Sequence, residues 1–120
     1  MLNLDTHVLL HAVGGELTAR EARLLRADRW SIAGIVLWEI AKLRQLGRIV
    51  LDLEDSEVSR VLAAIHIWPI TAEIARASMR LDFRADPADE LIAATSLVHR
   101  IPLLTRNRKL MGSKLVPLAK

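Results

Sequence analysis

The sequence contains no cysteine, and none of its apolar runs is long enough to cross a bilayer. The absence of cysteine excludes disulfides and thiolate metal sites. The N-terminus lacks a basic start followed by a cleavable apolar stretch, so we expect a soluble cytoplasmic protein that is neither secreted nor membrane-bound. Linkers, internal repeats and low-complexity tracts are also absent, which favours a single domain over residues 1–120.

The composition that is present suits a small globular domain. Hydrophobic residues make up 52% of the 120 residues, which is enough to form a core. The formal net charge of +3 is a modest basic excess. Such an excess is compatible with binding nucleic acid but does not require it, because many solvated protein surfaces carry a similar charge.

Short apolar segments alternate with helical patterns along the chain. Strands are expected at residues 2–4, 30–33, 67–70, 102–104 and 115–118. Helices are expected at residues 6–12, from 18 onward, at 34–46, around 58–65, at 71–81 and from 87 onward. This alternation predicts an α/β fold with a parallel sheet of four or five strands, covered by helices on both faces.

Local signals mark several helix ends. Thr18 followed by Glu21 forms a capping box at a helix start, and Gly47 is a typical helix stop. Thr71 can cap the next helix. Asp86 can cap the last long helix, because Pro87 suits the first helical position.

Asp5 raises the first functional question, because an apolar run stops at this acid in "LNLDTH". Ligands bind outside the carboxyl ends of the strands in parallel sheets, and Asp5 lies at such an end. The segment "TRNRKL" after Leu104 lies at another. Asp5 could equally be the N-cap of a helix that starts at Thr6, and the residues alone leave both interpretations open.

Two further acids stand in unusual surroundings. Glu39 shares a helix face with apolar residues in "SIAGIVLWEIAKL", which is costly unless the carboxylate is paired or binds a metal. The alternative is a surface Glu39 paired with Lys42. In "DPADELIAATS", Asp89 lies in the first helical turn after Asp86, and the helix cap and dipole alone explain this pair well.

Asp5, Glu39 and Asp89 are more informative together. Oxygen ligands without cysteine suit a hard cation such as Mg²⁺ or Mn²⁺, which relieves the repulsion among clustered carboxylates. Bound Mg²⁺ keeps several waters, and one of them can act as a nucleophile on a phosphoryl group. This chemistry needs no serine, cysteine or histidine nucleophile.

The order and spacing of five stretches resemble the PIN-domain family, and within it the VapC-like ribonuclease toxins of toxin–antitoxin pairs. The stretches are "LNLDTHVLLHA", "SIAGIVLWEIAKLRQLGRI", "PITAEIA", "DPADELIAATSLVHRIPLLTRNRKL" and "LVPL", which together cover nearly the whole chain. The resemblance implies a three-layer α/β/α sandwich and Mg²⁺- or Mn²⁺-dependent cleavage of RNA. It also implies a homodimer and a small antitoxin protein that blocks the site.

The same resemblance assigns roles to individual residues. Asp5, Glu39 and Asp89 are the expected catalytic and metal-binding acids, and Asp86 is the expected helix cap. Thr6 and Ser31 match positions near the acidic cluster. Supporting roles are also expected for Thr105 and Asn107, the latter ligating through its carbonyl oxygen.

Two positions depart from the family pattern. Asn107 stands where the family often has a fourth acid, and Glu90 follows Asp89 where an arginine is common. A neutral amide adds no charge to the cluster, so the departure at Asn107 puts a second metal ion in doubt.

Basic residues and histidines near these acids have two interpretations each. Arg106, Arg108 and Lys109 form either a phosphate-binding cluster for RNA or a solvated loop. His7 and His11 have a spacing that can bind zinc, but Val8 stands where a zinc protease has glutamate, so partly buried or interface histidines are expected instead.

The sequence therefore predicts an endoribonuclease that hydrolyses RNA with a metal-activated water. One alternative is a non-catalytic module that binds protein or RNA. Another is a metal-dependent phosphatase with Asp5 as nucleophile, although His7 stands where such enzymes usually carry a second acid.

Overall fold

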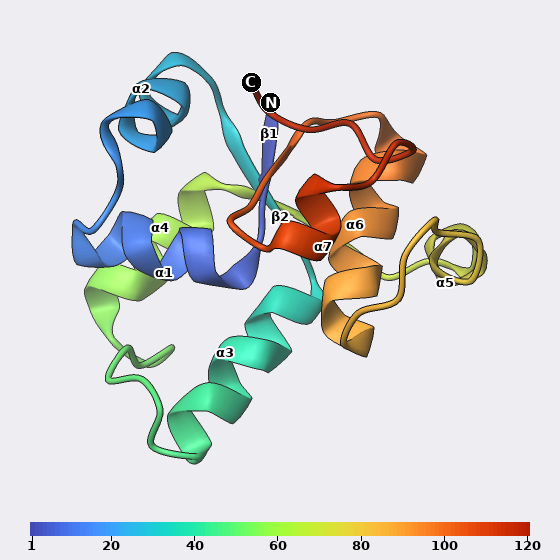
Figure 1. Ribbon diagram of the computed structural model, residues 1–120. Helices are drawn as coiled ribbons and strands as arrows, with labels where there is room; N and C mark the ends of the chain where they lie inside the picture. The colour runs from blue at the N-terminus through green and yellow to red at the C-terminus, as the bar shows by residue number, and fades with distance from the viewer.

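The computed structural model describes all residues from Met1 to Lys120, and a parallel sheet lies at its centre (Figure 1). The elements in chain order are β1 (Leu2–Leu4), α1 (Thr6–Gly14), α2 (Ala19–Ala27), β2 (Trp30–Ala33), α3 (Ile35–Gln45), α4 (Ser56–Ala64), β3 (His66–Trp68), α5 (Ala72–Ser78), α6 (Pro87–His99), β4 (Leu103–Leu104) and α7 (Arg108–Met111). The sheet has four strands in the order β3-β2-β1-β4, all of them parallel.

Helices cover both faces of this sheet, as the handedness of parallel connections requires. The chain moves in one direction from β1 through β2 to β3, and then returns past β1 to β4. Because these connections are right-handed, the reversal places α5 and α6 on the face opposite α1 and α4 (Figure 1). The expected three-layer α/β/α architecture is confirmed, with four strands in the sheet.

Two strand predictions need correction. The third strand occupies His66–Trp68 and ends before Pro69, which has no N–H to donate to a neighbouring strand. The segment 115–118 forms no strand. Its only pairing is an isolated bridge between Leu118 and Leu103, which covers the outer edge of β4.

The helix-end predictions are mostly correct. Thr18 and Glu21 form the complete capping box of α2, and the hydroxyl of Thr71 accepts a hydrogen bond from the backbone N–H of Ile74. Gly47 follows α3 with a φ of 73°, a left-handed conformation that glycine adopts without steric cost. The helix after Thr71 ends at Ser78, earlier than expected. None of the helices combines the length and apolar composition needed to span a membrane.

β1 lies at the centre of the sheet and is buried along its whole length. Its one polar residue, Asn3, is completely buried and donates through Nδ2 to the hydroxyl of Ser96 (2.9 Å) and the carbonyl of Ile92 (3.2 Å). Both acceptors lie on α6. This contact holds the strand that precedes Asp5 against the helix that carries Asp89.

Candidate active site

The strand order reverses between β1 and β4, and ligands of α/β sheets bind at such a reversal, outside the carboxyl ends of the strands. Asp5 directly follows β1, and residues 105–107 directly follow β4. At the same edge α3 packs against both α1 and α6. Figure 1 shows these three helices meeting at the end of β1, with both chain termini at the opposite end of the strand.

Asp5 is a buried acid with a fixed orientation. Its Oδ1 accepts the backbone N–H of Val8 (2.9 Å), so the N-cap interpretation is correct. Its Oδ2 accepts a hydrogen bond from the hydroxyl of Thr105. Burial raises the pKa of Asp5, and the hydrogen bonds from Thr105 and Val8 oppose that rise. The cap alone does not require the second contact, which ties Asp5 to the loop after β4.

Glu39 projects from α3 toward the start of α1. Its Oε1 accepts a hydrogen bond from the hydroxyl of Thr6, the residue after Asp5. Glu39 is half-buried, less than its apolar neighbours suggested. The alternative pairing with Lys42 is wrong, because the Lys42 ammonium donates to Gln45 (3.1 Å) and lies over the ring of Trp38.

Asp89 lies in the first turn of α6, and its pKa depends on the other acids. Burial raises the pKa of Asp89 to about 6, and the negative charges of Glu39, Asp5 and Asp86 add to that rise. The charges of Asp5, at the end of β1, and of Glu39, on α3, therefore act on Asp89.

Two supporting residues act differently from the prediction. Asp86 occupies the N-cap position of α6, but its side chain makes no capping hydrogen bond. Its effect on the site is electrostatic, through Asp89. The hydroxyl of Ser31 donates to the carbonyl of Leu2 (2.9 Å), so Ser31 joins β2 to β1 and makes no hydrogen bond to an acid of the cluster.

Asn107 faces Asp89 with its amide nitrogen instead of its carbonyl oxygen. Its Oδ1 caps α7 by accepting the backbone N–H groups of Lys109 (2.9 Å) and Leu110 (3.4 Å). Because these donors need an oxygen, the amide Nδ2 is left to approach Oδ2 of Asp89, at 3.5 Å. The expected metal ligation through the Asn107 carbonyl would therefore require breaking the cap of α7.

The donor set fits a hydrated hard cation. None of the three acids takes part in an ion pair with lysine, arginine or histidine. No three histidine, aspartate or glutamate side chains converge closely enough to enclose one ion as they stand. Mg²⁺ is usually held by one or two carboxylates and keeps several waters, so this open arrangement of carboxylates suits it. Asp5, Glu39 and Asp89 are the residues that would hold it.

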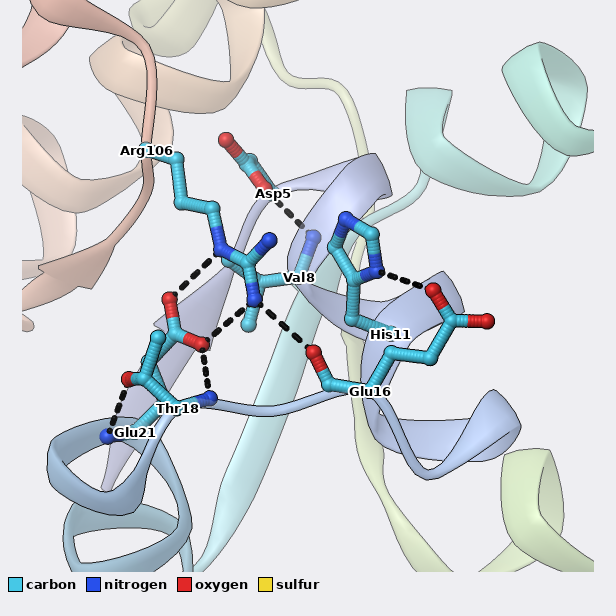
Figure 2. Close-up of polar contacts among 7 residues, drawn as sticks. All are labelled: Asp5, Val8, His11, Glu16, Thr18, Glu21 and Arg106. Atoms are coloured by element: carbon cyan, nitrogen blue, oxygen red, sulfur yellow. Dashed lines mark hydrogen bonds and ion pairs between the residues drawn. The ribbon is translucent and has the colours of Figure 1, made fainter.

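The side chain of Arg106 does not point freely to solvent. Its Nε donates to Oε2 of Glu21 (2.8 Å) and its Nη2 donates to Oε1 of Glu21 (2.7 Å), as Figure 2 shows. The Arg106 guanidinium lowers the pKa of Glu21 to about 2. Sequence reasoning assigned Glu21 only to the capping box and missed this pairing.

The remaining basic residues and the two histidines differ in their exposure. Arg108 and Lys109 are exposed, as either of their two interpretations requires. His7 is exposed, which leaves only the interface alternative as a prediction for it. His11 is half-buried, as expected, and its Nδ1 lies 3.8 Å from Oε2 of Glu16. Both histidines line a surface groove of about 820 Å³ between α1 and the segment before α4. No third histidine, aspartate or glutamate side chain converges with them.

The family model of the PIN domain matches residues 3–111 of the chain. Among curated proteins, the chain is 33% identical over 91 residues to Ribonuclease VapC22 of Mycobacterium tuberculosis. That alignment covers 73% of this chain and 70% of the relative.

Solved structures share the fold at lower sequence identity. VapBC2 from Rickettsia felis, bound to a DNA fragment from its promoter, matches with a TM-score of 0.75 and 16% identity, covering 99% of this chain and 98% of that one. A toxin–antitoxin complex from Klebsiella pneumoniae matches with a TM-score of 0.71 and 22% identity, covering 93% and 92%. At these identities the likeness shows the fold alone.

Proposed function

The chain belongs to the PIN domain family, and we propose that it is a Mg²⁺- or Mn²⁺-dependent endoribonuclease that acts as the toxin of a toxin–antitoxin pair. One observation carries this proposal. Asp5 at the end of β1 and Glu39 on α3 act electrostatically on Asp89 of α6, and no basic side chain is paired with any of these three carboxylates. Such an arrangement is unfavourable until a cation offsets its charge.

The protein's own residues fix the acids in place for this chemistry. The hydroxyls of Thr105 and Thr6 each donate to one acid, Asp5 and Glu39, and so limit the rotation of both carboxylates. A divalent cation, when bound, supplies an activated water and offsets charge on a phosphoryl oxygen. Exposed Arg108 and Lys109 lie in the first turn of α7, directly after the loop that carries Thr105, and can attract the RNA backbone.

The partners follow from the relatives. Ribonuclease VapC22 is named for an activity on RNA, and the structural neighbours are toxin–antitoxin complexes. We therefore propose RNA as substrate and a small cognate antitoxin as partner. The homodimer, and an antitoxin that blocks the site, are proposed from the family resemblance alone. The chain would act in the cytoplasm as one nuclease domain over residues 1–120.

Cleavage of total cellular RNA tests the proposed activity directly. The wild type should cut RNA with Mg²⁺ or Mn²⁺ and should stop when the ions are chelated. Asp5→Asn should be inactive under all conditions. Glu73→Gln, which removes an exposed acid from the first turn of α5, is the matched control and should cut like the wild type.

The alternative of a non-catalytic PIN module is supported by one feature of the same site, because no three acidic side chains converge on one point where a metal ion could bind. That module would bind RNA or protein equally well with and without divalent ions and would cut nothing. The phosphatase alternative has less support, since both oxygens of Asp5 are engaged by Val8 and Thr105. Trapping of a phosphoryl group on Asp5 would be its signature.

A further inference from the structure

We propose that Glu21 is a positioning residue for the active-site loop at residues 105–107, and that Arg106 serves this contact instead of binding RNA. The inference rests on the proposed function, because the loop matters only if the acidic cluster binds a cation. Under this proposal α2, which contributes no acid to the cluster, helps to hold the active-site loop in position.

Glu21 is buried at only 4% exposure, although it sits on a short helix with an otherwise basic outer face. Its capping role uses one contact, in which Oε1 accepts the backbone N–H of Thr18 (2.9 Å). A capping glutamate does not need to be buried to make that contact. The burial of Glu21 is instead explained by its contact with Arg106, which donates hydrogen bonds to both oxygens of the Glu21 carboxylate.

Arg106 makes a two-point contact that fixes its orientation. Beyond the two hydrogen bonds to Glu21, its Nη2 donates to the backbone carbonyl of Glu16 (3.1 Å). In Figure 2 the guanidinium lies between the α1–α2 connection and Glu21, with Asp5 on its other side. Two parallel N–H···O bonds between a guanidinium and a carboxylate define both distance and plane, which a single ammonium cannot do.

The neighbours of Arg106 in the chain both touch the acidic cluster. Thr105 donates to Asp5 and also accepts the backbone N–H of Asn107 (3.0 Å). Asn107 approaches Asp89 from the same loop. Three consecutive residues therefore contact three different elements, and the middle contact, Arg106 to Glu21, fixes the loop from which the other two side chains project.

RNA binding by Arg106 would make the opposite prediction for Glu21. If Arg106 bound phosphate, then removing the charge of Glu21 would release the guanidinium and strengthen RNA binding. If Arg106 positions the loop, the same change should weaken the site. Glu21→Gln therefore separates the two roles by the sign of its effect.

The experiment measures Mn²⁺ affinity by calorimetry, the kcat and KM of RNA cleavage, and the salt dependence of RNA binding. Glu21→Gln and Arg106→Gln should each weaken Mn²⁺ binding and lower kcat by about ten- to a hundredfold, as expected for residues that orient metal-site groups. The double variant should be no worse than the single ones, because both break one contact. KM and the salt dependence of RNA binding should stay unchanged. Arg106→Lys should restore only part of the activity.

Thr18→Ala controls for loss of helix stability. It breaks the capping box of α2 but leaves the Glu21–Arg106 pair, so it should lower the melting temperature without changing Mn²⁺ affinity. Arg23→Gln, an exposed arginine on the same helix, controls for loss of positive charge. If Glu21→Gln does not fold, Arg106→Gln compared with Thr18→Ala decides the question.

Two results would overturn the inference. One is an Arg106→Gln variant that binds Mn²⁺ normally but has a raised KM for RNA. In this variant the slope of log binding constant against log salt concentration would fall by about one, as expected for a lost phosphate contact. The other is a Glu21→Gln variant that binds RNA more tightly. If the wild type cuts no RNA, the proposed function fails, yet the Mn²⁺ measurements still test the positioning role.

Discussion

The acids that contact the loop after β4 fall into two groups, Glu21 alone and the cluster that includes Asp5 and Asp89, and these groups differ in one respect. Glu21 has a guanidinium partner, and its pKa falls to about 2. The charged groups that most affect the pKa of Asp89 are other carboxylates, and together with burial they raise it to about 6. Both are acids near the start of a helix, where the helix dipole favours negative charge, so the dipole does not account for the difference.

The comparison separates a structural acid from a candidate functional one. A buried charge that is fully paired holds elements together, as Glu21 joins α2 to the loop after β4. Carboxylates that are brought together without a cation cost stability, and a fold retains such a cost where a ligand offsets it. We therefore expect substitutions in the two groups to have different consequences.

The largest expected effect is on activity. Asp89→Asn removes one carboxylate from the cluster while keeping its size, so cleavage should fall by at least about a hundredfold, since metal-ion stabilisation is worth several kcal/mol. The same change should relieve the growth arrest caused by inducing the wild type alone in bacteria. The measurement compares arrest at equal expression. Equal arrest by Asp89→Asn would reject Asp89 as a catalytic ligand.

The next effect is on thermal stability. Mn²⁺ at about a hundredfold excess over its Kd should stabilise the fold by about 2.7 kcal/mol, because it binds only the folded state. Asp5→Asn should lose most of this gain and should melt higher than the wild type in chelator, since one repelling charge is gone. Thermal melts with and without ions measure both. If millimolar Mn²⁺ leaves the melting temperature of the wild type unchanged, the acidic cluster does not bind the ion as proposed.

The two groups should also respond oppositely to pH. The lowered pKa of Glu21 contributes stability above pH 4.5, which is lost as the pH falls toward 2. The raised pKa of Asp89 contributes stability below pH 3.8 in chelator, which is lost as the pH rises through 6. Each contribution should be about 1–2 kcal/mol after allowance for solvent screening.

Denaturant unfolding in chelator from about pH 2 to about pH 8 would resolve both contributions, because the pKa of Glu21 is about 2 in the folded protein and that of Asp89 is about 6. Asp89→Asn should remove the loss of stability near pH 6 and leave the acid side unchanged. Glu21→Gln should do the reverse. A single variant that flattened both sides would show that the groups are not independent.

The smallest expected effect is at Asn107. Asp is also a good N-cap, so Asn107→Asp should keep the cap of α7 while adding a charge near Asp89. The added charge should lower metal-free stability by about 1 kcal/mol and should tighten metal binding. Calorimetry paired with melts in chelator would detect both changes together. If neither changes, Asn107 lies too far from the cluster to influence it.

The sequence predicted the parts of this protein that local pattern and chain order encode. Apolar runs and capping residues located β1, β2, α2 and α3. Asp5 was selected by its place at a strand end, Glu39 by its apolar neighbours and Asp89 by the family resemblance, and the roles of these three acids stay predictions. The short helix α7 was not predicted, because four residues are too few to show a helical period. Its presence is what turns the Asn107 carbonyl away from the cluster.

The pairing of Glu21 could not be read from the sequence for a different reason. Its partner Arg106 lies 85 residues away, and each residue had a sufficient local explanation, as a capping glutamate and as a loop arginine. Asp86 shows the converse error. Its position before Pro87 satisfied the capping pattern, but only the folded chain shows that its side chain makes no capping hydrogen bond.

Calorimetric titration with Mn²⁺ tests most directly the central claim, that the unpaired acids form a cation site and the paired acid does not. The wild type and Glu73→Gln should bind Mn²⁺ saturably with equal affinity, and Asp5→Asn should show no saturable binding. Glu21→Gln should bind more weakly but still saturate. Absence of saturable binding to the wild type, or equal affinity in Asp5→Asn, would contradict the account.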